Sequence, residues 1–325
     1  MLLIDNPYTS PYFNIALEEH LLKQFDENIF MLYRNTPSII VGKHQNTLAE
    51  INAHFVRRHN LPVVRRISGG GTVYHDLGNL NYTFLVNAEK GKMVDFQRYA
   101  KPIVKALAET GINAYYAKTN SLFANGLKIS GNAEHVFKQR VLHHGTLLFN
   151  ANLEALEESL RVEHTHFQSR AVQSIRSKVT NISGLFPEPF SLSAFSQILF
   201  AFVKVHYSGG SFYTLQEDDI EAVERLVKQK YGTDEWNFGY SPSYAYRKVW
   251  QHPPFNLDIS LKVNKGIITE AAITDRETNM PWNTLNKVVE NLLHQPDVLA
   301  QAFAKHLADS YDENQQQALL NGFFG

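Results

Sequence analysis

Apolar side chains near the start of the chain recur at every third or fourth position, which is the spacing of one face of a helix. These positions are Phe13, Ala16, Leu17, Leu21 and Phe25. Glu18, Glu19 and Lys23 fall on the other faces. The pattern therefore predicts an amphipathic helix at the start of the chain.

Short runs that are rich in β-branched and aromatic residues predict strands after this helix. The predicted strands cover residues 29–33, 38–41, 62–66, 81–86, 113–116, 127–130 and 141–149. A further helix is predicted near 103–110, because its apolar pattern ends at Gly111, a residue suited to a helix C-terminus.

The second half of the chain is richer in helical patterns. Ser191 is placed to cap an apolar helix that continues through Tyr207. Thr214 and Glu217 have the spacing of a capping box, which predicts another helix to about Tyr231.

The final part of the chain indicates a second domain. Residues 236–255 are rich in Gly, Pro and aromatic side chains and are interpreted as an interdomain connection. A β-hairpin that turns at 264–266 and several helices are predicted after it. The fold class is thus α+β, with a large domain over 1–240 and a small one over 241–325.

Composition narrows the possible functions. The 325 residues include 31 Lys plus Arg against 32 Asp plus Glu, so no overall charge attracts nucleic acid or an anionic membrane. The chain has no cysteine, which excludes disulfides, thiolate metal sites and a cysteine nucleophile. Because we find neither a secretion signal nor an apolar run long enough to span a bilayer, we expect a cytoplasmic protein.

The segment RRISGGGTVYHDLGNLNYTF, residues 65–84, carries the strongest chemical signal. Three consecutive glycines, Gly69 to Gly71, allow a close approach of the backbone to a ligand, and their N–H groups can hold an anion. Arg65 and Arg66 can add charge-assisted hydrogen bonds to a phosphate or carboxylate. The segment matches neither a P-loop nor the G-x-G-x-x-G pattern, and a plain glycine turn between two strands is the alternative.

Two further motifs contain groups that could act on a ligand. In GLKISGNAEH, residues 126–135, Lys128 stands before a turn of small residues, where its ammonium could face a carboxylate or a phosphate. An exposed surface lysine is the alternative. In HHGTLLF, His143 and His144 are adjacent on a predicted strand and must point to opposite faces. No third ligand has suitable spacing, so no zinc site is predicted.

Together these motifs resemble the lipoate–protein ligase family over nearly the whole chain. The matching segments are PYFNIALEEH, GKHQN, the long glycine segment, KISGNA, HHGTLLF, SIRSKVTNIS and WNFGYSP. The resemblance implies the biotin/lipoate-ligase catalytic fold, a mixed central sheet flanked by helices, followed by a small C-terminal accessory domain. It also implies that this domain reorients about residues 236–255.

The resemblance implies a two-step reaction with ATP and Mg²⁺. Lipoic acid is first converted to lipoyl-AMP, and the lipoyl group then passes to a lysine of an acceptor protein. The implied acceptors are apo lipoyl domains of 2-oxoacid dehydrogenase complexes and the glycine-cleavage H protein. By the same resemblance, Lys128 is the catalytic residue, which contacts the lipoyl carbonyl and the α-phosphate.

The resemblance also implies a set of residues that bind the ligands. The set comprises Arg66, Ser68, Gly69, Gly70, Gly71, Thr72, Val73, Tyr74, His75, Asn79, Lys128 and His144. Strands such as 82–85 are expected to supply an apolar floor for the dithiolane tail.

Two positions depart from the family pattern. Ser121 stands where members often carry an acidic residue that holds magnesium, and serine is a poorer ligand for a hard cation. Lys43 stands where arginine is common and lacks its bidentate geometry. Asp76 is a substitute metal ligand that we hold only as a hypothesis.

Four other functions compete with a complete ligase. Related octanoyl transferases use a cysteine, which this chain lacks. Biotin–protein ligases have a Gly-Arg-Gly-Arg loop that is missing here. Two alternatives remain: a non-catalytic lipoate-binding protein, and an enzyme that only transfers lipoate from preformed lipoyl-AMP. ATP-dependent release of pyrophosphate distinguishes a complete ligase from both, because neither would show it.

Overall fold

A computed structural model of the chain describes residues 1–88, 94–117, 120–186, 188–207 and 209–324. Its largest sheet has eight strands in the order β12-β1-β2-β6-β10-β9-β8-β7. These strands are β1 (Leu2–Asp5), β2 (Ile29–Tyr33), β6 (Asn79–Asn87), β7 (Ala114–Ala117), β8 (Ser121–Ala124), β9 (Leu127–Phe137), β10 (Arg140–Leu148) and β12 (Ser211–Phe212). β1 runs parallel to β2 and β12, whereas the other pairs are antiparallel, so the sheet is mixed as expected.

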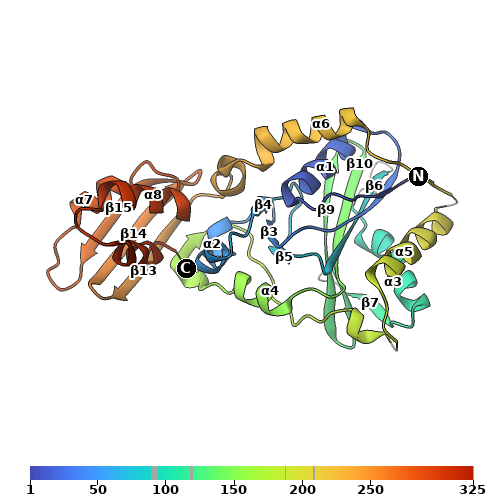
Figure 1. Ribbon diagram of the computed structural model, residues 1–325, viewed down its shortest axis with the longest axis horizontal. Helices are drawn as coiled ribbons and strands as arrows, with labels where there is room; N and C mark the ends of the chain where they lie inside the picture. The colour runs from blue at the N-terminus through green and yellow to red at the C-terminus, as the bar shows by residue number, and fades with distance from the viewer. Residues whose placement is uncertain (89–93, 118–119, 187, 208, 325) are drawn as a thin grey trace.

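Helices cover both faces of this sheet (Figure 1). On one face α3 (Phe96–Glu109) and α5 (Leu192–His206) pack against Phe84, Leu147 and other alternate residues of the strands. On the opposite face α1 (Pro11–Gln24) and α6 (Glu217–Leu226) pack with a second apolar cluster. Ser191 caps α5 as predicted, since its side chain accepts a hydrogen bond from the backbone N–H of Ala194.

The first helix is not amphipathic, and this prediction was wrong. α1 lies between the sheet and the segment that follows α6, so Glu18 and Glu19 are buried together with the apolar residues. Burial opposes ionisation of Glu19, yet hydrogen bonds from Lys23, Lys230 and Tyr231 lower its pKa to about 2. The carboxylates are tolerated inside because each has partners.

A three-stranded sheet lies beside the large one and carries the glycine-rich segment. Its strands are β3 (Ser38–Val41), β4 (Val63–Arg65) and β5 (Val73–His75), in the order β4-β3-β5. The glycine loop, residues 66–72, joins β4 to β5. β5 is an edge strand, with β3 on one side only. Two short helices, α2 (Ala53–Arg58) and α4 (Leu153–Leu160), pack close to this layer.

The C-terminal part forms an antiparallel sheet in the order β11-β13-β14-β15. Its strands are β11 (Phe167–Ser169), β13 (Tyr244–His252), β14 (Phe255–Asn264) and β15 (Ile267–Asp275), and its helices are α7 (Asn283–Val289), α8 (Pro296–His306) and α9 (Glu313–Asn321). The hairpin at 264–266 is confirmed. Within the predicted connection 236–255, the part Tyr244–His252 instead forms β13, because its aromatic side chains pack in the sheet.

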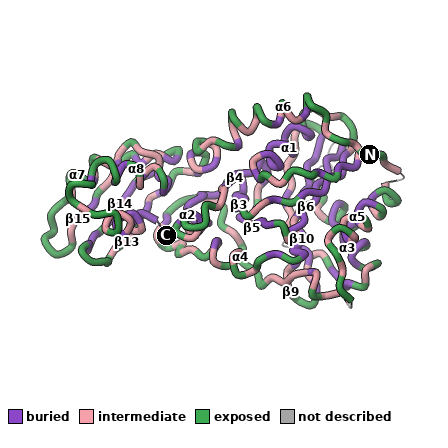
Figure 2. The backbone as a smooth tube through the Cα atoms, viewed as in Figure 1, coloured by how far each residue is buried: buried purple, intermediate pink, exposed green. Residues whose placement is uncertain are grey.

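The core of this C-terminal sheet is continuous with the three-stranded layer. Ile39 and Val56 belong to the same apolar cluster as Leu257 and Phe303, and buried residues run across the junction in Figure 2. β11 comes from the middle of the chain, yet it pairs with β13. The predicted capping box at Thr214 was wrong, because α6 begins two residues later with Gln216 and Asp219 as reciprocal partners.

His294 makes the stability of this region sensitive to acid. Its imidazole is buried, donates to the carbonyl of Phe323 (2.8 Å) and accepts from the Tyr244 hydroxyl (2.7 Å). Burial lowers its pKa from 6.5 to about 4. The unfolded chain therefore binds the proton more readily, so this part of the stability is complete above pH 6.5 and is lost as the pH falls towards 4.

We expect a loss of about 2 kcal/mol at about pH 5 from this group, and about 3 kcal/mol once the pH is well below its folded-state pKa. Urea unfolding at about pH 7.5 and about pH 5 measures it. In His294→Gln the free energy of unfolding should fall less steeply between these two conditions than in the parent chain. Equal slopes for the two proteins would contradict the assignment.

Within the described residues, no helix combines the length and the apolar character needed to cross a bilayer.

Candidate ligand-binding site

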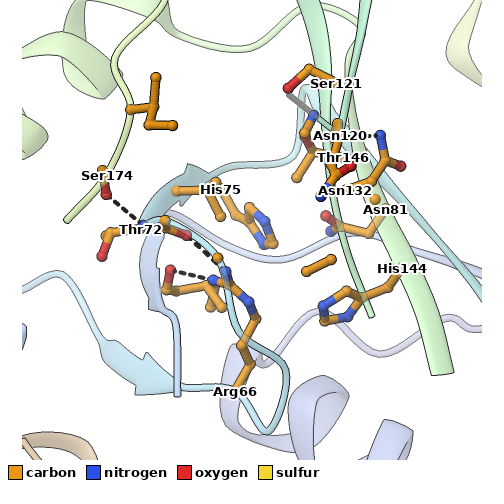
Figure 3. Close-up of a pocket in the computed structure, with 18 of the residues that line it drawn as sticks. Arg66, Thr72, His75, Asn81, Asn120, Ser121, Asn132, His144, Thr146 and Ser174 are labelled. Carbon is orange, nitrogen blue, oxygen red and sulfur yellow. Dashed lines mark hydrogen bonds between the residues drawn. The ribbon is translucent and has the colours of Figure 1, made fainter. Parts of the chain in front are cut away.

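A cavity of about 280 Å³ lies where the glycine loop faces the large sheet (Figure 3). We call it the central cavity. Its walls come from the glycine loop and β5 on one side and from β6, β9 and β10 on the other, and the segment 172–177 completes the lining. Residues that are far apart in the sequence therefore surround one space.

The sheet wall of the central cavity is polar because of a simple alternation in β6. Asn79, Asn81 and Thr83 are separated by two positions and are buried on one face, whereas Leu80 and Tyr82 belong to the apolar core on the other. Asn81 is registered with Thr146 of β10. Asn81 and Thr146 both line the cavity.

Arg66 shapes the glycine loop from within. Its guanidinium donates to the carbonyl oxygens of Gly69 (2.6 Å) and Gly71 (2.8 Å), and to the Ser68 hydroxyl (3.0 Å). Burial lowers the pKa of Arg66 to about 10, so the group remains a cation at neutral pH. With these carbonyl groups turned towards Arg66, the loop is held in one conformation beside the cavity.

Arg65 does not face the cavity, contrary to the prediction for the arginine pair. It is fully buried, and its donors are used by the backbone of the preceding loop and of the segment before β13. Its acceptors are the carbonyl oxygens of Gly42, Lys43, Gln45, Trp236 and Asn237 and the hydroxyls of Thr47 and Ser241. Adjacent residues of a strand point to opposite faces, which is why only one of the two arginines reaches the site.

A buried chain of hydrogen bonds links α1 to the glycine loop through His144. Its Nδ1 lies 2.8 Å from Glu18, and its Nε2 lies 2.6 Å from the Ser68 hydroxyl. Glu18 also accepts from Tyr33 (3.1 Å) and Thr83 (2.6 Å). Ser68 is completely buried, so this Ser-His-Glu array cannot present a nucleophile to a ligand and instead supports the loop. As predicted, His143 points the other way, towards Glu134.

Lys128 lies on β9 between two cavities. Its ammonium rests over Gly131, where a Cβ atom would be 3.3 Å from Nζ. Burial lowers the pKa of Lys128, and no described carboxylate lies within ion-pair distance of it. A desolvated cation without a protein counter-ion is suited to an anionic ligand.

The second cavity, about 730 Å³, is called the leucine cavity after its apolar wall. The wall comprises Leu127, Leu148, Leu153, Leu156 and Leu160. The leucine cavity shares Lys128, Thr72 and Val73 with the central cavity, so the two spaces meet at the lysine.

Residues 170–180, which we call the strap, contribute to the lining of both cavities. The Ser174 hydroxyl accepts from the backbone N–H of Thr72 (2.9 Å) and from Gln45 (3.1 Å), and it donates to Glu50. The strap then runs beside β9, where the Lys128 N–H donates to the carbonyl of Lys178 (2.9 Å). These bonds connect the strap to the glycine loop and to the strand of the lysine.

The structure brings most of the predicted residues to one place. Arg66, Gly70, Gly71, Thr72, Val73, His75, Lys128 and His144 line the central cavity, and Tyr74 lines the leucine cavity. Ser68, Gly69 and Asn79 do not line either cavity, and Ser68 and Asn79 lie behind the wall as supports. Asn81, Thr146 and Tyr33 also line the central cavity but were not predicted, although the alternation in β6 points to Asn81.

The described lining of the central cavity contains no carboxylate. Ser121 lines it, and Asp76 does not. Both oxygens of Asp76 accept backbone N–H groups, from Gly78 (2.9 Å) and Asn152 (2.7 Å), so this side chain caps a turn rather than holding a metal. Among the described residues, no three His, Asp or Glu side chains are grouped as a metal site.

Comparison with known proteins gives a consistent result. The family model described as the lipoyl protein ligase A/B catalytic domain matches residues 10–204. Lipoate–protein ligase 1 of Staphylococcus aureus is 37% identical over 273 residues, 83% of this chain and 82% of the relative. The lipoate-protein ligase LplJ of Bacillus subtilis is 36% identical over 278 residues, 84% of each chain.

Solved structures of ligases also resemble this fold. A lipoate-protein ligase A bound with ATP has a TM-score of 0.64 at 23% identity and covers 74% of this chain and 98% of its own. LipL1 of P. falciparum in complex with lipoate has a TM-score of 0.61 at 22% identity and covers 99% and 98%. At these identities the likeness concerns the fold alone.

Proposed function

The chain belongs to the lipoate–protein ligase family, and from this premise we propose that its two adjoining cavities divide the substrates between them. It is an ATP-dependent ligase that joins lipoate to an acceptor protein. The central cavity takes the lipoyl group, and the leucine cavity takes the adenosine. The position of Lys128 between the two cavities is the observation that carries this assignment.

The central cavity suits an acyl chain with a polar head. Ile15, Tyr33 and Ile40 contribute apolar surface, and Lys128 lies at the end of the cavity that adjoins the leucine cavity. A carboxylate beside the lysine would be desolvated together with it, which strengthens their attraction. The tail then extends along the sheet towards Arg66 and His144.

The leucine cavity suits a nucleoside. Leucine side chains can pack on the faces of a purine, while β5 borders the cavity with its unpaired edge. The backbone N–H and C=O groups on an open strand edge can pair with a base. Because Thr72 and Val73 line both spaces, the glycine loop reaches the point where the phosphate must lie.

Lys128 acts by charge in both steps. In the first, a lipoate oxygen attacks the α-phosphorus, its P–O bond forms, and the bond to the leaving pyrophosphate breaks. In the second, the acceptor lysine nitrogen attacks the lipoyl carbonyl carbon, loses a proton and releases AMP. Negative charge grows on phosphate or acyl oxygens each time, and the ammonium offsets it without forming a bond.

Magnesium enters as part of the ATP substrate in this proposal. Asn120, Ser121, Asn132 and Thr146 offer only neutral oxygens to the central cavity, and its described lining has no carboxylate. The leucine cavity adds Glu50, which already accepts from Ser174, and Glu157, but no group of three His, Asp or Glu side chains is found among the described residues. Such a site does not fit a resident Mg²⁺ ion held by the protein. The metal is instead carried by the triphosphate, and the transfer step needs none.

The proposed acceptors are lipoyl domains and the glycine-cleavage H protein. The solved archaeal ligase from Thermoplasma acidophilum is described with its E2 lipoyl domain, which supports lipoyl domains of 2-oxoacid dehydrogenase complexes as acceptors here. We include the glycine-cleavage H protein among the acceptors and the cytoplasm as the location. We also propose a catalytic domain over 1–240 and an accessory domain over 241–325.

Intact mass spectrometry of an apo lipoyl domain tests the function. One reaction contains this protein, lipoate, ATP and Mg²⁺, and a parallel one contains lipoyl-AMP without metal. A lipoyl mass gain in both, with pyrophosphate released only in the first, is the expected result. A gain with lipoyl-AMP alone would reduce the protein to a transfer enzyme, and a gain in neither would leave only ligand binding.

Gly42 tests whether the position of the glycine loop matters for the reaction. A Cβ atom there would lie 2.0 Å from the Gly70 carbonyl oxygen, so Gly42→Ala must displace the loop. We expect kcat/KM for ATP to fall by about tenfold to 100-fold. Gly184→Ala is the matched control, because a Cβ atom there meets nothing within 4 Å. Equal activity of both variants would contradict the role of the loop.

A further inference from the structure

Two buried N–H donors in the central cavity have no described acceptor in the protein. They are Nε2 of His75 and Nδ2 of Asn81, in side chains that are 3% and 2% exposed. Both residues line the cavity, His75 from β5 and Asn81 from β6 (Figure 3). A buried donor without a partner is costly, so the two groups together point to a ligand that accepts from them.

The hydrogen-bond network around His75 determines which ring nitrogen carries the proton. Asn14 donates to the side-chain oxygen of Asn35 (2.8 Å), so the Asn35 amide nitrogen faces Nδ1 of His75 (2.9 Å) and donates to it. Burial, with Arg66 and His144 nearby, lowers the pKa of His75 to about 3, which keeps the ring neutral. The single ring proton is therefore on Nε2.

Asn79 is the neighbour of Asn81 on the same face of β6. The Asn79 amide nitrogen donates to the side-chain oxygen of Asn81 (2.9 Å). The amide nitrogen of Asn81 and the side-chain oxygen of Asn79 are then left without a described partner, and of these two residues Asn81 is the one that lines the cavity. Asn79 thus supports Asn81 from behind the cavity wall, and Asn81 forms part of the wall itself.

The strand order places these donors relative to Lys128. Its ammonium lies over Gly131 of β9, Gly131 donates to Thr146 of β10 (3.1 Å), and Thr146 is registered with Asn81 of β6. Two strand spacings amount to about 10 Å. This is roughly the reach of an extended octanoyl chain whose carbonyl lies at the lysine, so the end of that chain lies beside Asn81 and His75.

We propose that His75 and Asn81 select lipoate over acids of the same length without sulfur, by donating to the sulfur atoms of the dithiolane ring. The inference rests on the lipoyl group occupying the central cavity. An octanoyl tail presents only C–H groups to these donors, whereas a sulfur atom is an acceptor, although a weak one. A site built around hydrogen bonds discriminates against an analogue that cannot make them.

Three substrates and three proteins test the proposal. The substrates are lipoate, octanoate and 5-cyclopentylpentanoate, whose ring has the shape of dithiolane with carbon in place of sulfur. The proteins are the parent chain, Asn81→Val and Asn87→Val. The last makes the same substitution at the exposed end of β6, outside both cavities. The readouts are kcat/KM for each acid and the Kd for each acid by calorimetry.

We expect the parent to favour lipoate over the carbocyclic acid by about five- to tenfold in both measures. Asn81→Val should bring this ratio close to one, with the lipoate value falling and the carbocyclic value retained or raised. Asn87→Val should keep the parent ratio. A parent that does not distinguish the two rings, or an Asn81→Val variant with the parent ratio, would overturn the proposal.

The same data separate this inference from the proposed function. If all three proteins lipoylate the acceptor with unchanged ratios, the ligase assignment holds and the selectivity proposal fails. If the parent chain forms no lipoylated product, the function itself fails. His75→Phe provides a second variant: it keeps a ring and removes the donor, and its ratio should fall in the same direction.

Discussion

Lys128→Ala is expected to lower the rate of acceptor lipoylation by at least about 100-fold, which is the scale for removing a group that stabilises developing charge. The ammonium is desolvated, has no described carboxylate partner and lies where the two cavities meet. Among the described residues that line both cavities, Lys128 is the only cation, since Arg66, Arg176 and Lys178 each line just one of them. Both half-reactions should suffer, so lipoyl-AMP should not rescue the variant.

Two further lysine variants make this result specific. Lys138→Ala removes an exposed lysine from the end of the same hairpin and should retain the parent rate. Lys128→Arg keeps the charge but not the compact ammonium, and we expect it to remain far below the parent. Unfolding midpoints identify any loss that comes from misfolding. A Lys128→Ala variant with normal turnover would remove the assigned role of this residue.

Local patterns were sufficient for most of the fold. The strands over 29–33, 38–41 and 141–149 and the helix after Ser191 agree with the structure within a residue or two. Each has a clear period or cap in its own sequence. α1 was misjudged because the number of faces that a helix buries depends on its tertiary neighbours. The pairing of β11 with β13 was missed because partners distant in the sequence leave no local signal.

The same division applies to the site. The glycine loop and Lys128 were predicted from motifs that resemble those of the family, and the structure places both at the cavities. Asn79 was predicted as a ligand-binding residue, yet Asn81 lines the cavity and Asn79 does not, since a two-residue period alone cannot tell which member of a polar face meets the ligand and which supports it. Glu18 was missed entirely, because its role depends on a contact with His144 across 126 positions.

Arg65→Met is expected to lower the free energy of unfolding by about 3 kcal/mol or more. The side chain is completely buried, and it donates hydrogen bonds to the carbonyl oxygens of Gly42, Gln45 and Asn237. Methionine fills part of the volume but leaves these buried acceptors without donors. Burial lowers the pKa of Arg65 to about 10, so the charged form is the one removed at neutral pH.

Arg65 also joins the loop of Gly42 to the segment that leads into β13. On one side it holds the loop of Gly42, against which the glycine loop packs. On the other side its backbone N–H donates to Asn237 (2.8 Å) and its carbonyl accepts from Trp236 (2.7 Å), in the segment that leads into β13. We therefore expect Arg65→Met to reduce ligation at temperatures at which the protein is still folded.

Urea unfolding followed by tryptophan fluorescence measures the stability change, because Trp236 donates to the Arg65 carbonyl and Trp250 lies in β13. Arg58→Met, at an exposed position of α2, is the control and should change the free energy by no more than about 0.5 kcal/mol. Unfolding of Arg65→Met at the same urea concentration as this control would contradict the prediction. Water would then have to satisfy the acceptors around Arg65, and the junction would be more open than the buried position of the guanidinium implies.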